Sequence, residues 1–166
     1  GVWRWVVAVT RGRCLREGAT KVAGKTVIRV HALDNSMKTL LVDDDTTAQS
    51  VVTDMCQKLG LKNYRDVAPC YSIHECTDGV TIGPPLADGT LVVPAMTAWP
   101  PGDSAKFVFT VKLYMESQQN STESRVVHMH YIQAVYNVIC GIYPTSMDEG
   151  VALAALQVQA KFGVEV

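Results

Sequence analysis

A polar, low-complexity stretch divides this sequence into two parts with different hydrophobic periods. The stretch ESQQNSTES (116–124) follows a segment in which apolar and polar residues alternate, as they do in strands. After it, apolar residues recur every three or four positions, as they do in amphipathic helices. Because 48% of the 166 residues are hydrophobic and 19% are charged, the chain can bury a sizeable core. We predict an arm over 1–24, a strand-rich unit over 25–115, a linker over 116–124 and a helical unit over 125–166.

Two β-branched segments at the start of the strand-rich unit predict a hairpin. KTVIRVHAL (25–33) and MKTLLV (37–42) have the composition of strands. Between them, Asp34-Asn35-Ser36 supplies short polar side chains that satisfy local backbone groups and tolerate unusual φ angles. We expect the two strands to pair as antiparallel neighbours.

A helix is predicted directly after the hairpin. Thr46 and Gln49 have the spacing of a capping box, and the aspartates at 43–45 favour the positive end of the helix dipole. Gly60 is expected to end the helix. The aspartates lack the alternating ligand positions of a calcium loop, so we interpret them as residues that precede the helix N-terminus and not as a metal site. The apolar face consists of Val51, Val52, Met55 and Leu59.

Two further strands are predicted, at CYSIHECT (70–77) and KFVFTVKLYM (106–115). The connection over 80–105 is rich in proline, and Pro94 predicts that its apolar piece LVVPAMTAW (91–99) is not a regular helix. The order is therefore two strands, a helix, a strand, an irregular passage and a last strand. This order predicts an α+β fold, a ubiquitin-like β-grasp roll.

The C-terminal part predicts a helical hairpin, the beginning of an incomplete α-bundle. Its first helix ends before Gly141 and Pro144, and Ser146 with Glu149 forms the capping box of a second helix that closes at Gly163. Two helices bury little surface alone, so we expect the sequence to be a fragment whose unpaired helix faces promote association. The apolar face of the first helix consists of Tyr131, Ile132, Val135, Val138 and Ile139.

Charge is distributed unevenly, although the formal net charge is only −1. Four arginines lie in the arm over 1–24, at Arg4, Arg11, Arg13 and Arg16. A nucleic-acid domain presents its basic patch on a folded face, so no nucleic-acid partner is predicted. We interpret the arm as a solvated linker or a segment docked on an acidic neighbour, with contact to anionic lipid as the alternative. The longest uncharged stretch, 89–102, contains three prolines and is too short to span a bilayer.

Five cysteines, an odd number without CxxC spacing, indicate reduced thiols of a cytosolic protein. They are Cys14, Cys56, Cys70, Cys76 and Cys140. Cys70, His74 and Cys76 share one strand face by parity, but strand residues two apart lie about 6.5–7 Å apart, which is awkward for a tetrahedral zinc site. We therefore predict no metal site.

No catalytic or cofactor-binding residue is predicted. Cys56 and Cys140 lie on apolar helix faces, where free cysteine acts as a small hydrophobe. His128 and His130 are two residues apart on a helix, so they point to different faces, one partly buried and one exposed. The sequence contains neither a dinucleotide fingerprint nor a GK[ST] phosphate loop. Asn120 begins a glycosylation acceptor pattern, which matters only in a secreted chain.

The C-terminal part contains a series of short motifs. YIQAVYNVICGIYPTSMDEGVALAALQVQAKFG (131–163) has a YxQ-type first helix, a G-x-YP turn, an acidic cap and LAALQ-x-QA-x-FG. In this it resembles the start of the helical second lobe of FERM domains. KTLLVDDDTTAQSVVTDMCQKLGL (38–61) is similar to the ubiquitin-like first lobe, especially in unconventional myosin tails. YSIHE (71–75) and LVVPAMTAW (91–99) resemble later segments of that lobe. Talin-like and kinesin-like FERM proteins are the other relatives that the pattern suggests.

The resemblance implies a non-catalytic interaction module. FERM domains bind cytoplasmic tails of membrane proteins, phosphoinositides or cytoskeletal proteins, and in motor tails they take cargo. For this chain the resemblance implies protein partners and a place in the cytoplasm, at the cytoskeleton or the inner membrane surface. It implies no cofactor. It transfers no partner-binding residue, because the shared motif consists of helix faces and caps.

Two alternatives remain open at this point. The first is a ubiquitin-like module outside the FERM family, which binds a GTPase or another partner through the strand at 37–42. Lys38 is the basic residue of that strand, whereas the aspartates at 43–45 oppose binding to an acidic effector surface. The second is a thiol enzyme that uses Cys56 or Cys140.

Overall fold

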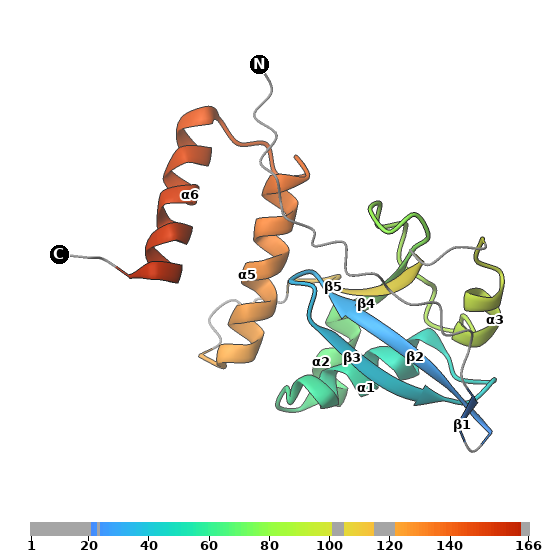
Figure 1. Ribbon diagram of the computed structural model, residues 1–166. Helices are drawn as coiled ribbons and strands as arrows, with labels where there is room; N and C mark the ends of the chain where they lie inside the picture. Colours follow the sequence, from blue (N-terminus) through green and yellow to red (C-terminus); the bar gives the residue numbers. More distant parts are fainter. Residues whose placement is uncertain (1–20, 23, 101–104, 115–121, 164–166) are drawn as a thin grey trace.

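The computed structural model describes residues 21–22, 24–100, 105–114 and 122–163 (Figure 1). The strands are β1 (Lys21–Val22), β2 (Lys25–Ala32), β3 (Met37–Val42), β4 (Tyr71–Cys76) and β5 (Lys106–Val111). The helices are α1 (Ala48–Leu59), α2 (Tyr64–Val67), α3 (Val92–Thr97), α5 (Ser124–Ile139) and α6 (Met147–Phe162), and a 3₁₀ turn, η1, spans Ala68–Cys70.

Strand β2 lies at the centre of a mixed sheet. It pairs antiparallel with β3, in the register Thr26↔Val42, along one edge. Its other edge holds the short β1 and, further along, β5, which runs parallel to β2 with Val30 opposite Phe107. Strand β4 pairs antiparallel with β5 and completes the five-stranded sheet. A hairpin whose first strand also pairs in parallel with the last strand has the predicted ubiquitin-like β-grasp topology, so the α+β prediction is confirmed.

Helix α1 packs across one face of this sheet and forms the core with it. Val51, Met55 and Cys56 of α1 are 0% exposed. The rings of Tyr71 and Phe109 stack beneath them with centroids 5.0 Å apart. The sheet side of the core consists of Ile28, Val30, Leu40, Val42, Tyr71, Ile73, Phe107 and Phe109. Burial of these apolar side chains is the main force that holds the helix on the sheet.

The predicted turn between β2 and β3 is confirmed in detail. Asn35 has a positive φ of 63°, which asparagine tolerates better than most residues. The backbone N–H of Ser36 donates to Asp34 Oδ1 at 2.9 Å. The turn therefore satisfies its own backbone groups with its own side chains.

The helix predicted after the hairpin is present, but its cap differs from the prediction by one residue. The N-cap is Thr47, whose Oγ1 accepts from the backbone N–H of Ser50 at 3.3 Å. Thr46 cannot fill this role because its Oγ1 accepts from the backbone N–H of Asp43 at 2.9 Å. The predicted Thr46–Gln49 capping box is therefore wrong. The predicted end at Gly60 is confirmed, with φ 70° and ψ 36°.

Two predictions about the second half of the sheet unit were wrong. Residues Val92–Thr97 form the helix α3 although they include Pro94. Proline is tolerated there because it lies in the first helical turn, where a backbone N–H has no partner within the helix. Strand β5 ends at Val111, earlier than predicted, because the chain then turns and both Lys112 and Leu113 donate to the carbonyl of Cys70.

Helices α5 and α6 form the predicted hairpin, and α5 lies between α6 and the sheet (Figure 1). The predicted apolar face of α5 was mostly wrong: Tyr131 is 49% and Ile139 is 58% exposed, and only Ile132 of that set is buried. The difference arises because α5 packs on the end of β5 and not on α6. The buried residues of α5 are Val126, Met129, Ile132, Gln133 and Asn137.

Candidate interaction surfaces

Helix α5 is fixed to the sheet unit by apolar and polar contacts. Val126, Met129 and Ile132 belong to the same buried cluster as the sheet core. Arg125 Nη1 donates to the carbonyl of Gly60, the C-cap of α1, at 2.9 Å. The cation at that position also interacts favourably with the negative C-terminal end of the α1 dipole. The helix therefore has one defined position on the sheet unit.

A second polar contact joins α5 to the turn of the β2–β3 hairpin. His128 Nε2 lies 3.0 Å from Asp34 Oδ2. Burial raises the pKa of Asp34, but the hydrogen bonds from Ser36 and His128 outweigh it, and the pKa is lowered overall. The carboxylate is therefore ionised at neutral pH and accepts from both partners.

Gln133 continues the hydrogen-bonding edge of β5 where β2 has ended. The backbone N–H of Val111 donates to Gln133 Oε1 at 3.0 Å. Gln133 Nε2 in turn donates to Asn137 Oδ1, one helical turn later, at 3.1 Å. Both amide side chains are 7% exposed. This pair was not predicted from the sequence, where Gln133 belongs to the YxQ motif and stands four residues before Asn137 on a helix otherwise rich in apolar residues.

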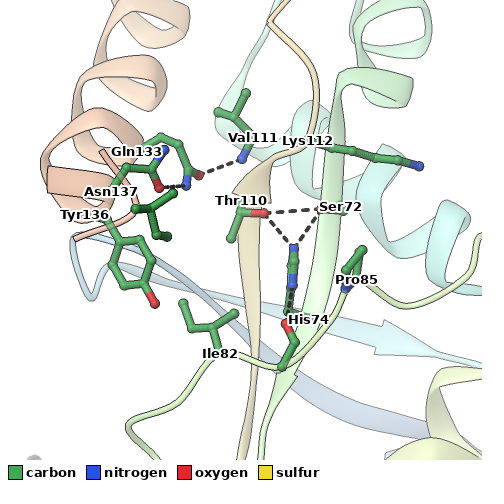
Figure 2. Close-up of a pocket in the computed structure, with 12 residues that line it drawn as sticks. Ser72, His74, Ile82, Pro85, Thr110, Val111, Lys112, Gln133, Tyr136 and Asn137 are labelled. Atoms are coloured by element: carbon green, nitrogen blue, oxygen red, sulfur yellow. Dashed lines mark hydrogen bonds between the residues drawn. The ribbon is translucent and has the colours of Figure 1, made fainter. Parts of the chain in front are cut away.

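A cleft of about 340 Å³ opens beside this amide pair, between α5 and the face of the sheet opposite α1. Figure 2 shows side chains from β4, β5, the 82–85 loop and α5 around it. Its polar groups come from Ser72, His74, Thr110, Lys112, Gln133, Tyr136 and Asn137. Its apolar walls include Ile82, Pro85, Val111, Tyr136 and Ile142. Apolar walls with a few convergent polar groups are typical of ligand sites.

His74 is held in one tautomer at the side of this cleft. Its Nδ1 lies 2.8 Å from the carbonyl of Gly83, which only accepts, so Nδ1 carries the proton. Its Nε2 then accepts, and it lies 2.9 Å from both Ser72 Oγ and Thr110 Oγ1. Burial lowers the pKa of His74, although the bond to Gly83 opposes this in part. The imidazole is therefore neutral at pH 7.

The contact between Ser72 and His74 has the distance of a nucleophile and its base, but it is part of a closed network. Ser72 Oγ also lies 3.2 Å from Thr110 Oγ1, so two hydroxyls share the single lone pair of the imidazole. Ser72 and Thr110 are 6% and 5% exposed. These groups satisfy one another across β4 and β5, as buried polar groups usually do.

The structure does not bring the cysteine and histidine candidates together. Cys70 lies at the end of η1, before the strand begins, so strand parity does not apply to it, and it packs in the core. His74 lines the cleft, and the thiol of Cys76 lies 3.8 Å from Asp78 Oδ1. The described residues contain no group of three or more potential metal ligands.

The two cysteines considered as nucleophiles lie in different surroundings. Cys56 is buried, as predicted, and burial raises the pKa of its thiol to about 12. A thiol with this pKa is almost entirely protonated at neutral pH and is a weak nucleophile. Cys140 was predicted on an apolar helix face, but it is exposed at the C-cap of α5, where the helix ends.

The remaining candidates have structural contacts. Asp43 forms an ion pair with Lys25 at 3.0 Å. His128 is exposed and His130 is half-buried, so the prediction that they point to different faces is confirmed. The ring of His130 lies 5.2 Å from that of Tyr114. Cys14, the basic arm with Arg4, Arg11, Arg13 and Arg16, and the pattern at Asn120 lie outside the described residues.

Helix α6 presents an apolar surface along its whole length. None of its residues is buried, although it is rich in alanine, leucine and valine. Its large apolar side chains are 41–73% exposed, and they are Met147, Val151, Leu153, Leu156, Val158 and Phe162. Exposed apolar patches of this kind mark interaction surfaces. Within the described parts of the chain, no helix is both long and apolar enough to cross a bilayer.

Two family models match the chain. A family model described as RA like domain matches residues 24–127. The chain belongs to the RA-like domain family. A second model, the FERM central domain, matches residues 116–165. The two matches overlap over 116–127, and the predicted FERM resemblance is confirmed.

Among curated proteins, the RA-like chain is similar to talin-B of Dictyostelium discoideum. The two are 28% identical over 139 residues, which cover 82% of this chain and 5% of talin-B. The chain thus spans a small part of the relatives that it matches.

Among solved structures, the RA-like chain shares its fold with myosin tail domains. The MyTH4-FERM MF1 domain of Dictyostelium discoideum myosin VII matches with a TM-score of 0.70 and 18% identity, over 86% of this chain and 30% of that one. The C-terminal MyTH4-FERM domain of human myosin 7b, solved in complex with the harmonin-a PDZ3 domain, matches with a TM-score of 0.61 and 15% identity. That match covers 86% of this chain and 30% of the myosin chain.

Proposed function

We propose that this chain is a non-catalytic protein-interaction module of a cytoskeletal linker or motor tail. The observation that carries the proposal is the FERM central-domain match over 116–165, which follows the RA-like match over 24–127 without a gap. The human myosin 7b domain of similar fold was solved with a PDZ domain bound, which supports protein partners. The partners we propose are cytoplasmic tails of membrane proteins or cytoskeletal proteins.

We also propose how the chain is divided into lobes and where in the cell it acts. We propose that 25–115 and 125–166 act as successive lobes joined by 116–124, and that the arm over 1–24 contacts anionic lipid or an acidic neighbour. The similarity to talin-B and to myosin VII supports a parent protein of the talin or myosin type. It also supports a place in the cytoplasm, at the cytoskeleton or the inner membrane surface.

The experiment is a titration of the purified chain against fluorescein-labelled peptides from cytoplasmic tails of membrane proteins. We expect the anisotropy of at least one peptide to rise and saturate, while a scrambled peptide of the same composition gives no saturation. If no peptide saturates up to about 1 mM, where binding is too weak to be specific, the proposal fails.

A second candidate function is binding of a small GTPase or another partner at the edge of β3. The RA-like match and the sheet order favour it, because β3 pairs only with β2 in the described sheet and leaves one edge open. Met37 and Leu41 on this strand are 44% and 53% exposed. An added partner strand would pair with this edge. Titration with nucleotide-loaded small GTPases tests it, and the absence of saturable binding removes it.

A further inference from the structure

The cleft between α5 and the sheet contains amide N–H groups without an acceptor. Asn137 Oδ1 accepts from Gln133 Nε2 at 3.1 Å, but the amide hydrogens of Asn137 itself reach no acceptor among the described residues. Gln133 Nε2 likewise has a second hydrogen beyond the one given to Asn137. Both residues line the cleft and are 7% exposed. These N–H groups open onto the cleft, where water can accept from them, so an occupant that displaces the water must supply an acceptor in its place.

The surroundings select an uncharged acceptor. Among the described residues, no aspartate or glutamate lines the cleft, and the His74 imidazole is neutral. Lys112 is a lining residue, but Figure 2 shows its ammonium turned away from the amide pair, and it lies 3.8 Å from Asp88. A carboxylate would lose its hydration here without a facing cation, which is far more costly than desolvation of a carbonyl.

The apolar walls and the volume of the cleft suit a short segment with an aliphatic side chain. Ile82 and Pro85 lie on the loop side of the cleft, and Ile142 lies on the α5–α6 side. The volume of about 340 Å³ is at the lower end of the range for ligand pockets. The cleft therefore suits a short piece of a chain, with one aliphatic side chain and its flanking peptide groups.

We propose that this cleft binds a short, uncharged peptide segment of a partner protein. A backbone carbonyl of that segment accepts from the side-chain amides of Asn137 and Gln133, and an aliphatic side chain packs against Ile82, Pro85 and Ile142. The inference rests on the proposed function as a protein-interaction module, and it names the site and the chemistry that the site recognises.

The experiment follows the side-chain amide signals of Asn137 and Gln133 in two-dimensional NMR spectra of the full 15N-labelled chain. The probe is N-acetyl-leucine-N′-methylamide, which offers two carbonyls and one aliphatic side chain. We expect saturable shifts of both amide signals, with a Kd of about 1–10 mM for a ligand of this size. The absence of saturable shifts at these signals would overturn the proposal.

Two further probes test the stated chemistry. N-acetyl-leucine keeps the size but replaces one amide by a carboxylate, and we expect it to bind at least about fivefold more weakly. The alcohol 4-methyl-2-pentanol keeps the aliphatic group but offers a single hydroxyl in place of the two carbonyls, and we expect smaller shifts of the amide signals. Equal binding of the carboxylate probe, or equal shifts with the alcohol, would contradict an uncharged carbonyl as the group recognised.

Variants locate the binding in the cleft. Asn137→Leu removes the donor and is expected to weaken binding of the methylamide at least fivefold, whereas Gln157→Leu removes an exposed amide from α6 and is expected to change nothing. If Asn137→Leu does not fold, Ile82→Asp places a charge in the wall from a loop and is expected to weaken binding similarly. Unchanged affinity in the folded variant would overturn the proposal.

The two proposals fail separately. If tail peptides bind the chain while the Asn137 and Gln133 signals stay fixed with every probe, the cleft inference is overturned and the proposed function stands. If the methylamide binds the cleft but no tail peptide saturates, the cleft chemistry stands and the proposed function fails.

Discussion

Gly60 combines a left-handed backbone with the close approach of the Arg125 side chain from α5. Its φ is +70°, and an added Cβ would lie 1.6 Å from Arg125 Nη1. We expect Gly60→Ala to lower the free energy of unfolding by about 2–3 kcal/mol. Of this, about 1–2 kcal/mol comes from the left-handed conformation and about 1 kcal/mol from the lost hydrogen bond between Arg125 and the Gly60 carbonyl. Urea unfolding followed by circular dichroism measures the difference.

Gly141→Ala is the matched control for this change. Gly141 has almost the same φ, +71°, but an added Cβ there would meet no atom within 4 Å. In Gly141→Ala, the free energy of unfolding should fall only by the part that comes from the left-handed conformation, about 1–2 kcal/mol. Equal losses in the two variants would mean that the Arg125 contact contributes nothing to stability.

Gln133 supplies the acceptor for the last backbone N–H of β5. We expect Gln133→Leu to destabilise the fold by about 1–3 kcal/mol, because the N–H of Val111 then stays buried without an acceptor. Gln159→Leu, on the exposed surface of α6, should leave the unfolding midpoint unchanged. A midpoint that is equally unaffected in both variants would contradict the role assigned to Gln133.

Among single residues, the sequence predicted the features that neighbouring residues determine, but not those that depend on partners distant in the sequence. The turn at Asn35 and the end at Gly60 follow from backbone preferences that neighbouring residues decide. The amide pair of Gln133 and Asn137 could not be predicted, because its role depends on where β2 stops beside β5. Neither strand is near these residues in the sequence.

Helix α6 depends on its own cap, because none of its residues is buried. The hydroxyl and backbone N–H of Ser146 donate to Glu149 Oε2, each at 2.8 Å. These bonds lower the pKa of Glu149 below its ordinary value of 4.5. A lowered pKa in the folded state stabilises the helix above about pH 4.5, and this contribution is lost as the pH falls through the lowered value. We expect the helical 13Cα shifts of α6 to decrease below pH 4.5.

Glu149→Gln separates this effect from general acid unfolding. Glutamine at the same position keeps a capping box but does not titrate. The pH dependence of the α6 shifts should flatten in this variant, while the signals of α1 behave as before. A transition of unchanged depth would show that another group controls the helix.

Among helices and strands, the sequence pattern predicted β2 to β5, α1, α5 and α6, but it did not predict β1, α2 or α3. Thr46 and Thr47 are both good capping residues. Thr47 is the N-cap because the hydroxyl of Thr46 already accepts from the backbone N–H of Asp43. Pro94 lies in a helix because it falls in the first turn, which a sequence cannot fix without the helix start. The apolar face of α5 was misassigned because the helix packs on the end of a strand and not on α6.

Across the whole molecule, the apolar surface of α6 and a net charge of −1 favour contact between copies. We expect sedimentation velocity to show association that increases with concentration. Leu156→Gln and Phe162→Gln, at positions 61% and 71% exposed, should reduce association without lowering the unfolding midpoint. Lys161→Gln is the control on the same helix. A sharply monomeric wild-type protein at high concentration would contradict this expectation.

The order of elements was enough to predict the ubiquitin-like fold, because few topologies accommodate a hairpin, a crossing helix and two later strands. The position of α5 against the sheet was beyond sequence reasoning, because it depends on single contacts such as Arg125 with Gly60 and His128 with Asp34. The cleft lies at this interface and was therefore not predicted either.

The parallel pairing of β2 with β5 also determines when the molecule can fold during its synthesis. The ribosome releases the hairpin and α1 long before β5, yet β4 reaches β2 only through β5. Val30 pairs with Phe107, which lies far along the sequence, and pairings between residues so distant in sequence form slowly. A nascent chain halted before Lys106 therefore exposes an edge of β2 and an unfinished core, which makes it prone to aggregation.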